Sequence, residues 1–160
     1  MLRAHDNLLL LFCLGMISAC SGIKTYPNNI EKNLVIKTET DSGSFFSSVK
    51  ASLDIYDVNP DCKLDYVGTV KLDRPKVEVG IKPGRNSYLS FRFSSSGFLS
   101  NSSSNISYDT LIKPRKQYQY DTRVRYKNNI YNVQIIEKLS VKSRGRELVT
   151  RHLGQCKQLW

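Results

Sequence analysis

Apolar and polar residues alternate along the chain from Asn33 onward, and this two-residue period restricts the fold more than any other feature. Successive side chains of a β-strand point to opposite faces, so alternation is typical of a strand with one buried face. These runs predict an all-β domain. Their members are Leu34, Ile36 and Thr38; Val49, Ala51, Leu53 and Ile55; Leu64, Tyr66, Val70 and Leu72; Val77, Val79 and Ile81; Leu89, Phe91 and Phe93; Ile106, Tyr108 and Thr110; Tyr118, Tyr120, Thr122, Val124 and Tyr126; and Tyr131, Val133 and Ile135.

Turn-forming residues separate the runs at regular intervals. Asn59-Pro60-Asp61 and Lys82-Pro83-Gly84-Arg85 each end a run, and Asn128-Asn129 supplies a tight hairpin turn. About seven or eight short strands with such turns predict an antiparallel β-sandwich. The serine-rich stretch from Ser94 to Ser107 interrupts the pattern, and we expect it to form the longest loop.

The hairpin around Pro83 carries a family resemblance. Alternating runs from Tyr66 to Val70, from Val77 to Ile81 and from Ser87 to Phe91 surround the turn Pro83-Gly84-Arg85. This arrangement resembles the Pro-Gly hairpin of transthyretin-like and PEGA-type modules on bacterial surfaces. Those families are mostly binding or scaffolding modules, so the resemblance implies a role of that kind.

An apolar run near the start of the chain carries a second resemblance. Leu8 to Met16 is shorter than the about 20 apolar residues that a membrane-spanning helix needs, and it has the length of a signal-peptide core. Ile17-Ser18-Ala19-Cys20 follows it and resembles the lipobox of bacterial lipoprotein precursors. In that family the cysteine is lipidated and the preceding peptide is removed. The alternative is a buried helix with an ordinary thiol at Cys20.

The lipobox resemblance implies how the chain is divided and where in the cell the protein is located. Residues 1–19 would be a cleaved signal helix, residues 20–32 a flexible lipidated tether and residues 33–160 the β-sandwich domain. Ser21 after the cysteine resembles the variant that is sent to the outer membrane. We therefore expect a lipoprotein anchored in that membrane and facing the periplasm.

The cysteines divide according to this scheme. Cys13 would leave with the signal peptide and Cys20 would carry the lipid, so Cys62 and Cys156 remain. Two thiols exported to an oxidising compartment are expected to pair. We expect no metal site and no cofactor, because the mature chain keeps a single histidine, His152, and has no Cys-x-x-Cys motif.

Positive charge is concentrated in the C-terminal third of the chain. The net charge is +10, and the segment from Lys113 to Trp160 contains 12 basic and 3 acidic residues. Such a segment is a candidate surface for anionic polymers or lipid headgroups, and the alternative is an ordinary solvated face. The candidate surface consists of Lys113, Arg115, Lys116, Arg123, Arg125, Arg144 and Arg146.

The motifs that suggest catalysis are weak. Ser47 and Lys50 match the Ser-x-x-Lys motif of penicillin-recognising enzymes, but alternation places them on opposite faces of a strand. His152 lies in a basic tail. Asp54, Asp57 and Asp61 surround a turn, where a role in the turn itself is the simpler interpretation. We expect no enzymatic activity and name no catalytic residue.

Aromatic residues offer two candidate contacts. Tyr118, Tyr120 and Tyr126 share one strand face, which either stacks on a ligand or packs in the core. Phe98 and Leu99 lie amid serines, where they either contact a partner or close one end of the sandwich.

These features favour a non-enzymatic lipoprotein that contributes a periplasmic β-sandwich to an envelope assembly and binds a protein partner. The lipid-anchored sandwich of type VI secretion is similar in plan. One alternative is a periplasmic inhibitor of a hydrolase or a ligand-binding lipoprotein. Another is electrostatic docking to an anionic envelope polymer. We do not expect a nucleic-acid partner, because an exported protein rarely meets one.

Overall fold

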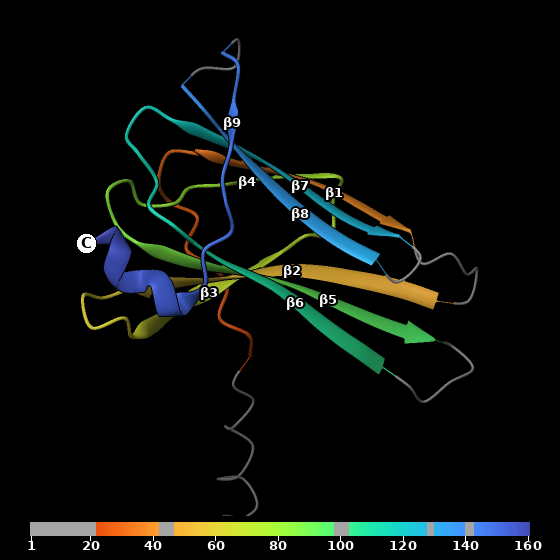
Figure 1. Cartoon of the computed structure of the whole chain (residues 1–160). Helices are drawn as coiled ribbons and strands as arrows, with labels where there is room; N and C mark the ends of the chain where they lie inside the picture. Colours follow the sequence, from red (N-terminus) through yellow and green to blue (C-terminus); the bar gives the residue numbers. More distant parts are fainter. Residues whose placement is uncertain (1–21, 42–46, 98–102, 128–129, 140–142) are drawn as a thin grey trace, which may run out of the picture.

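Two β-sheets pack face to face (Figure 1). A computed structural model describes residues 22–41, 47–97, 103–127, 130–139 and 143–160. The predicted β-sandwich is confirmed, with nine strands and one 3₁₀-helix among the described residues. The elements are β1 (Leu34–Asp41), β2 (Ser47–Val58), β3 (Leu64–Lys71), β4 (Lys76–Val79), β5 (Ser87–Gly97), β6 (Ser103–Ile112), β7 (Gln119–Lys127), β8 (Ile130–Lys138), β9 (Arg146–Glu147) and the helix η1 (Leu153–Leu159).

The strand order shows one departure from a wholly antiparallel arrangement. The five-stranded sheet has the order β4-β1-β7-β8-β9, and the four-stranded sheet has the order β3-β2-β5-β6. The neighbouring strands are antiparallel except β1 and β7, which pair in parallel from Leu34 and Tyr120 onward. Two neighbouring parallel strands need a long crossover connection between them. Here the chain builds all four strands of the other sheet, together with β4, before it returns beside β1.

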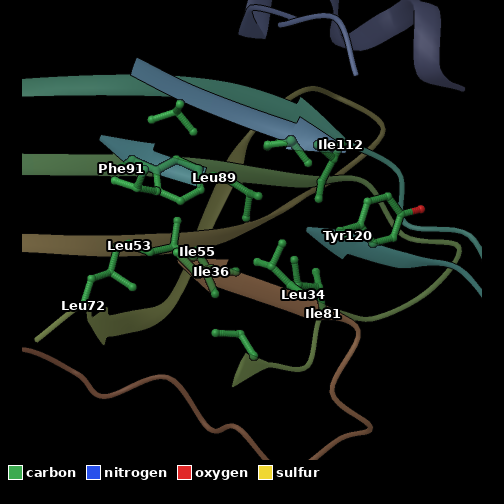
Figure 2. Packing of buried hydrophobic residues seen from close by; sticks show 14 of the residues in the cluster. Leu34, Ile36, Leu53, Ile55, Leu72, Ile81, Leu89, Phe91, Ile112 and Tyr120 are labelled. Carbon is green, nitrogen blue, oxygen red and sulfur yellow. The ribbon is translucent and has the colours of Figure 1, made fainter. Parts of the chain in front are cut away.

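The core lies between the sheets and consists of the inward members of the predicted runs (Figure 2). Leu34, Leu53, Leu89 and Phe91 are fully buried. Near the ends of β5 and β7, the Phe93 ring stacks on the Tyr126 ring at 6.0 Å between centroids. These contacts join the two sheets through apolar side chains, whose burial is the main favourable term in folding.

A β-bulge changes the face on which part of β3 lies. Leu64 and Tyr66 pair with Val58 and Tyr56, but Val70 pairs with Leu53, because the register shifts between Ile55 and Tyr56. The even alternation from Leu64 to Leu72 predicts a single shared face, and this prediction is wrong. The extra residue of a bulge turns the following side chains to the opposite face of the sheet.

The serine-rich stretch is mostly strand rather than loop. β5 continues to Gly97 and β6 begins at Ser103, with Ser94 opposite Asn105 and Ser95 opposite Ser104. The predicted long loop is therefore wrong over most of Ser94 to Ser107. Backbone pairing continues the hairpin here, although the side chains give no apolar alternation that would signal a strand.

The C-terminal tail joins the two sheets. It leaves β9, and the amide of Leu111 in β6 donates to the Arg151 carbonyl at 2.9 Å. The helix η1 then covers a second, smaller apolar cluster that includes Val58, Leu111 and Cys156. The tail thus packs on the outer face of the four-stranded sheet near the ends of β2 and β6.

Part of the predicted flexible tether is packed against the domain. Thr25 forms a parallel bridge with Thr69, and Tyr26 is 7% exposed within the core cluster. In Figure 1 this segment, drawn in orange, runs from the four-stranded sheet to the start of β1. The prediction of a flexible linker over residues 20–32 is thus wrong from Lys24 onward, because backbone bonds and a buried tyrosine hold the segment. No helix among the described residues has the length and apolar character needed to span a membrane.

Candidate functional site

Three of the predicted site residues lie outside the described residues. These are the candidate lipidation residue Cys20 and the candidate partner contacts Phe98 and Leu99. The geometry that bears on function therefore comes from the segment that follows Cys20, from the disulfide and from the charged surfaces.

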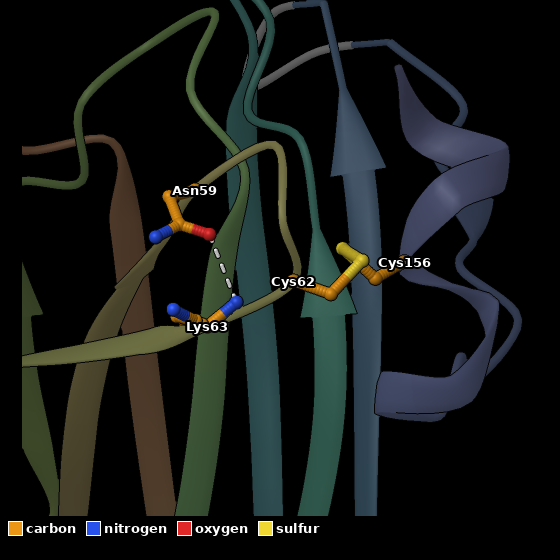
Figure 3. Close-up of a disulfide and its surroundings, with 4 residues drawn as sticks. All are labelled: Asn59, Cys62, Lys63 and Cys156. Atoms are coloured by element: carbon orange, nitrogen blue, oxygen red, sulfur yellow. Dashed lines mark hydrogen bonds between the residues drawn. A yellow bond between two sulfur atoms is a disulfide. The ribbon is translucent and has the colours of Figure 1, made fainter.

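The predicted disulfide between Cys62 and Cys156 is confirmed (Figure 3). Its Cα atoms are 5.8 Å apart. The side-chain oxygen of Asn59 accepts a hydrogen bond from the Lys63 amide at 2.9 Å, and this closes the turn that presents Cys62. Cys62 itself has a positive φ of 62°. The bond attaches η1 to the end of β2 and β3 and covers one end of the outer face.

The N-terminal segment is held against two strands that belong to different sheets. The amide of Tyr26 donates to the Thr69 carbonyl at 3.0 Å, and the Thr69 amide donates to the Lys24 carbonyl at 2.8 Å. The Tyr26 hydroxyl donates to the Gly80 carbonyl at 2.7 Å. Burial raises the pKa of Tyr26, with a further contribution from the charge of Asp57. The segment therefore bridges β3 and the end of β4.

Two glycines make this docking possible. A Cβ atom at Gly68 would lie 2.6 Å from the Tyr26 Cα atom, and one at Gly80 would lie 2.6 Å from the Ile30 carbonyl oxygen. Real Cβ atoms do not approach other atoms so closely, so both positions need glycine for close backbone approach.

A broad groove begins at the docked segment and continues past β3 onto the outer face of the four-stranded sheet. We call it the β3 groove. Its basic lining residues are Lys50, Lys71, Arg74, Lys76 and Arg92, and its acidic ones are Asp73 and Glu78. The apolar Ile23 lies at its rim beside the segment and is 74% exposed.

Only some of these cations are neutralised. Lys76 forms an ion pair with Glu78 at 2.6 Å, and Arg92 forms one with Asp54 at 2.8 Å. Within the described part of the chain, Lys50, Lys71 and Arg74 have no ion-pair partner. The groove therefore presents three unpaired cations next to the docked segment.

A buried carboxylate, that of Asp54, pairs with Arg92. Asp54 is 5% exposed although it points away from the core. It accepts a hydrogen bond from the Thr69 hydroxyl, which also contacts the Tyr66 hydroxyl at 2.6 Å. These partners satisfy the buried charge, which would otherwise be costly. The same strand position, Thr69, thus binds both the N-terminal segment and this carboxylate.

The predicted basic surface does not form one patch. Arg115 and Arg146 both pair with Glu137, which is 5% exposed and lies at the edge of the core. The Tyr120 hydroxyl donates to Glu137 at 3.0 Å and accepts from the Arg115 amide at 2.8 Å. Two of the seven cations therefore close one end of the sandwich.

The pKa values of this cluster are shifted because its members share the carboxylate of Glu137 and because the cluster is partly buried. The hydrogen bond from Arg115 lowers the pKa of Glu137, and those from Tyr120 and Arg146 lower it further. Burial raises the pKa of Tyr120 to about 12. The pKa of Arg115 is raised by its hydrogen bond to Glu137. The Arg115 guanidinium also lies 4.2 Å from the Tyr118 ring centroid.

The other basic residues lie in separate places. Arg123 and Arg125 project from the outer face of the five-stranded sheet, where Arg125 pairs with Glu39 at 3.0 Å. Lys113 donates to the Leu159 carbonyl at 3.0 Å. Lys116 and Arg144 are exposed. Alternation and the turn before β7 thus direct the side chains of the candidate basic surface to different faces, and its role in binding anionic partners stays a prediction.

Arg123 belongs to a cationic row on the outer face of the five-stranded sheet. The pairing places Lys76 opposite Lys37 and Lys37 opposite Arg123. Lys37 and Arg123 have no ion-pair partner in the described ranges. Like charges directly opposite on neighbouring strands are destabilising. Lys76 also lines the β3 groove, so the row meets that groove at β4.

The residues considered for catalysis are spread over several elements. His152 is exposed at the start of η1, and Lys50 is exposed on β2. Asp57 pairs with Lys82 at 3.4 Å, whereas Asp54 is occupied by Arg92. In the described ranges, no three His, Cys, Asp or Glu side chains are grouped so that they could hold a metal ion.

The three tyrosines have structural surroundings. Tyr120 and Tyr126 are buried in the core, and Tyr118 is half-buried beneath Arg115. Their rings are therefore not a platform for a stacked ligand. Sequence reasoning missed the β3 groove, although Gly68 and Gly80 within strand-like runs were a signal of close backbone approach.

Comparison with known proteins gives one structural neighbour. No family model matches the chain, and no curated protein matches it. Among solved structures, it is similar to transthyretin from Sparus aurata, with a TM-score of 0.46 and 10% sequence identity. The aligned region covers 68% of this chain and 99% of that chain.

Proposed function

We propose that this protein is a lipid-anchored component of the bacterial envelope whose β-sandwich binds a protein partner and performs no catalysis. In this proposal, Cys20 carries acyl chains in the outer membrane and the sandwich occupies the periplasm. The partner belongs to a membrane-associated assembly. The alternative role is that of a periplasmic inhibitor or ligand-binding lipoprotein.

The observation that carries this proposal is the docking of the segment that follows Cys20. The backbones of Lys24 and Tyr26 are hydrogen-bonded to Thr69 of β3, and Tyr26 is buried. Lys24 is four positions after Cys20, and an extended chain of four residues spans at most about 14 Å. An acyl anchor at Cys20 would therefore hold the sandwich close to the bilayer in a limited range of orientations. Such a constraint suits a component that presents a defined face to a partner.

The disulfide supports an exported location. Disulfides persist in oxidising compartments such as the periplasm and are rare in the cytosol. Cys62 and Cys156 are 94 residues apart in the sequence, and their bond holds the C-terminal tail on the domain. The geometry thus agrees with the lipobox resemblance, which implies export.

Metabolic labelling with an alkyne-bearing palmitate tests the anchor in cells. The unchanged protein should be labelled and sediment with membranes, and Cys20→Ser should lose both properties. Cys13→Ser is the matched control and should keep both, because position 13 would be removed with the signal peptide. Equal labelling of Cys20→Ser and the unchanged protein would contradict the proposal.

Photo-crosslinking in intact cells tests the binding role. We would place the crosslinking residue at position 123, on the cationic row, and at position 98, in the predicted contact loop. A membrane-complex protein captured at either position supports the proposed role, whereas a soluble hydrolase would support the inhibitor role instead. Crosslinking to neither class, in cells where the protein is acylated, would remove the protein-binding role.

A further inference from the structure

We infer that the β3 groove lies against the bilayer and that Lys50, Lys71 and Arg74 bind the phosphates of anionic lipid headgroups. This inference rests on the proposed acylation of Cys20. The cations that would face the membrane are thus on β2, β3 and the turn after β3. The sequence had suggested the C-terminal third for this role.

The first argument is distance along the chain. Thr25 is bonded to Thr69 in β3, and Lys71 lies two residues farther along the same strand. Two residues of strand span about 7 Å. Lys71 pairs with Ser52, and Lys50 lies two residues from Ser52 on the same face of β2. Lys71, one of the unpaired cations, therefore lies about 7 Å along β3 from Thr69, where the anchor segment docks.

The second argument is charge. Five basic and two acidic residues line the groove, and one of these acids, Glu78, is paired with Lys76. Lys50, Lys71 and Arg74 are exposed and have no acidic partner in the described part of the chain. Each Lys or Arg close to an anionic membrane surface contributes to binding, and the attraction decays within a Debye length of about 8 to 10 Å. The short anchor segment would keep these cations within that range.

The third argument is the apolar residue beside the anchor. Ile23 is 74% exposed at the rim of the groove, between the position of Cys20 and the docked segment. An exposed isoleucine in water is unfavourable, whereas the headgroup and acyl boundary of a bilayer can bury it. Ile23 and the three cations together have the composition of a membrane-contacting surface.

The turn before β7 provides the matched control. Lys116 lies in this turn, next to the Arg115–Glu137 pair that closes one end of the sandwich, and is exposed without an ion-pair partner in the described ranges. No residue of this turn lines the β3 groove. Lys116 therefore reports on the intrinsic reactivity of an exposed lysine on the same molecule.

Residue-resolved lysine acetylation tests the inference on the unchanged, full mature protein. The protein is extracted from membranes, its intact mass is measured, and it is reconstituted into vesicles of phosphatidylcholine alone or mixed with phosphatidylglycerol. In the anionic vesicles, acetylation of Lys50 and Lys71 should be about fivefold slower, the factor that corresponds to about 1 kcal/mol per cation at an anionic surface. Added sodium chloride should remove this protection, and Lys116 should react equally in all samples.

The outcomes separate this inference from the proposed function. If the protein carries acyl chains but Lys50 and Lys71 react equally in both kinds of vesicle, the inference is wrong and the anchor stands. If soluble polyphosphate protects these lysines as well as anionic vesicles do, the groove binds an anionic polymer and the lipid assignment is wrong. If the intact mass shows no acyl chains, the proposed function fails and this inference fails with it.

Discussion

The backbone of Tyr26 lies directly against Gly68, so that a Cβ atom at position 68 would come within 2.6 Å of the Tyr26 Cα atom. Because of this contact, the segment after Cys20 packs as part of the domain and is not the flexible linker that the sequence predicted. The contact also determines where an acyl anchor would hold the sandwich.

Replacing Gly68 by Ala should displace this segment. The added methyl group meets backbone atoms of Thr25 and Tyr26, which cannot move without breaking their bonds to β3. We expect the free energy of unfolding to fall by about 1–3 kcal/mol, and tryptic cleavage after Lys24 to accelerate. Gly154→Ala is the control, because a Cβ atom there meets no other atom within 4 Å. Unchanged cleavage in Gly68→Ala would show that the docking contact is not needed.

Glu137 should make folding stability depend on acid pH. Hydrogen bonds from Arg115, Tyr120 and Arg146 hold the pKa of Glu137 below its usual value, so its contribution is present above the unfolded pKa of about 4.3. The contribution is lost as the pH falls through the lower, folded pKa. Glu137→Gln should therefore lose about 2 kcal/mol at pH 7, and its urea midpoint should approach that of the unchanged protein in acid.

The control for this substitution is Glu39→Gln. It removes an exposed ion pair with Arg125 and should change the free energy of unfolding by less than about 1 kcal/mol. A gap between Glu137→Gln and the unchanged protein that persists undiminished at the lowest pH would show that the charge of Glu137 is not what stabilises the cluster.

The disulfide should contribute strongly to stability. Cys62 and Cys156 close a loop with a sequence separation of 94 residues, and the chain-entropy model assigns such a loop about 4.6 kcal/mol. The double variant Cys62→Ser/Cys156→Ser should therefore unfold at markedly lower urea concentration, and a reductant should have the same effect on the unchanged protein. If reduction leaves the urea midpoint in place, the tail is held by the apolar cluster around Leu111 instead.

Removing one charge from the cationic row should stabilise the protein. Lys37 and Arg123 are direct cross-strand partners with like charge, so Arg123→Gln should raise the free energy of unfolding by about 0.2–1 kcal/mol at low salt. Arg125→Gln, two residues along the same face, removes the ion pair with Glu39 and should not stabilise. An equal effect of the two substitutions would argue against repulsion within the row.

Most of the strands could be predicted from alternation, because burial of one face imposes a period of two residues on the sequence. Leu34, Leu53, Phe91 and Val124 all lie in the core as expected. The cysteine pair could also be predicted, since the lipobox resemblance implies that only Cys62 and Cys156 are left to pair.

The structure differs from the sequence predictions where backbone geometry, rather than the apolar pattern, determines the fold. The bulge beside Ile55 reverses the face of Tyr66, and the serine-rich hairpin is held by backbone pairing with no apolar signal. The parallel pairing of β1 with β7 depends on how distant segments assemble. The β3 groove depends on the docking of Thr25 on Thr69. Gly68 was a signal that some backbone approaches β3 closely, but not of which segment does so.

The mass of the native protein tests the central claim most directly. Protein extracted from bacterial membranes should begin at Cys20 and should carry the added mass of a diacylglycerol on the sulfur and a further acyl group on the new amino terminus. A protein that retains Met1 and has an unmodified thiol at position 20 would contradict the anchor, the exported location and the orientation that depends on them.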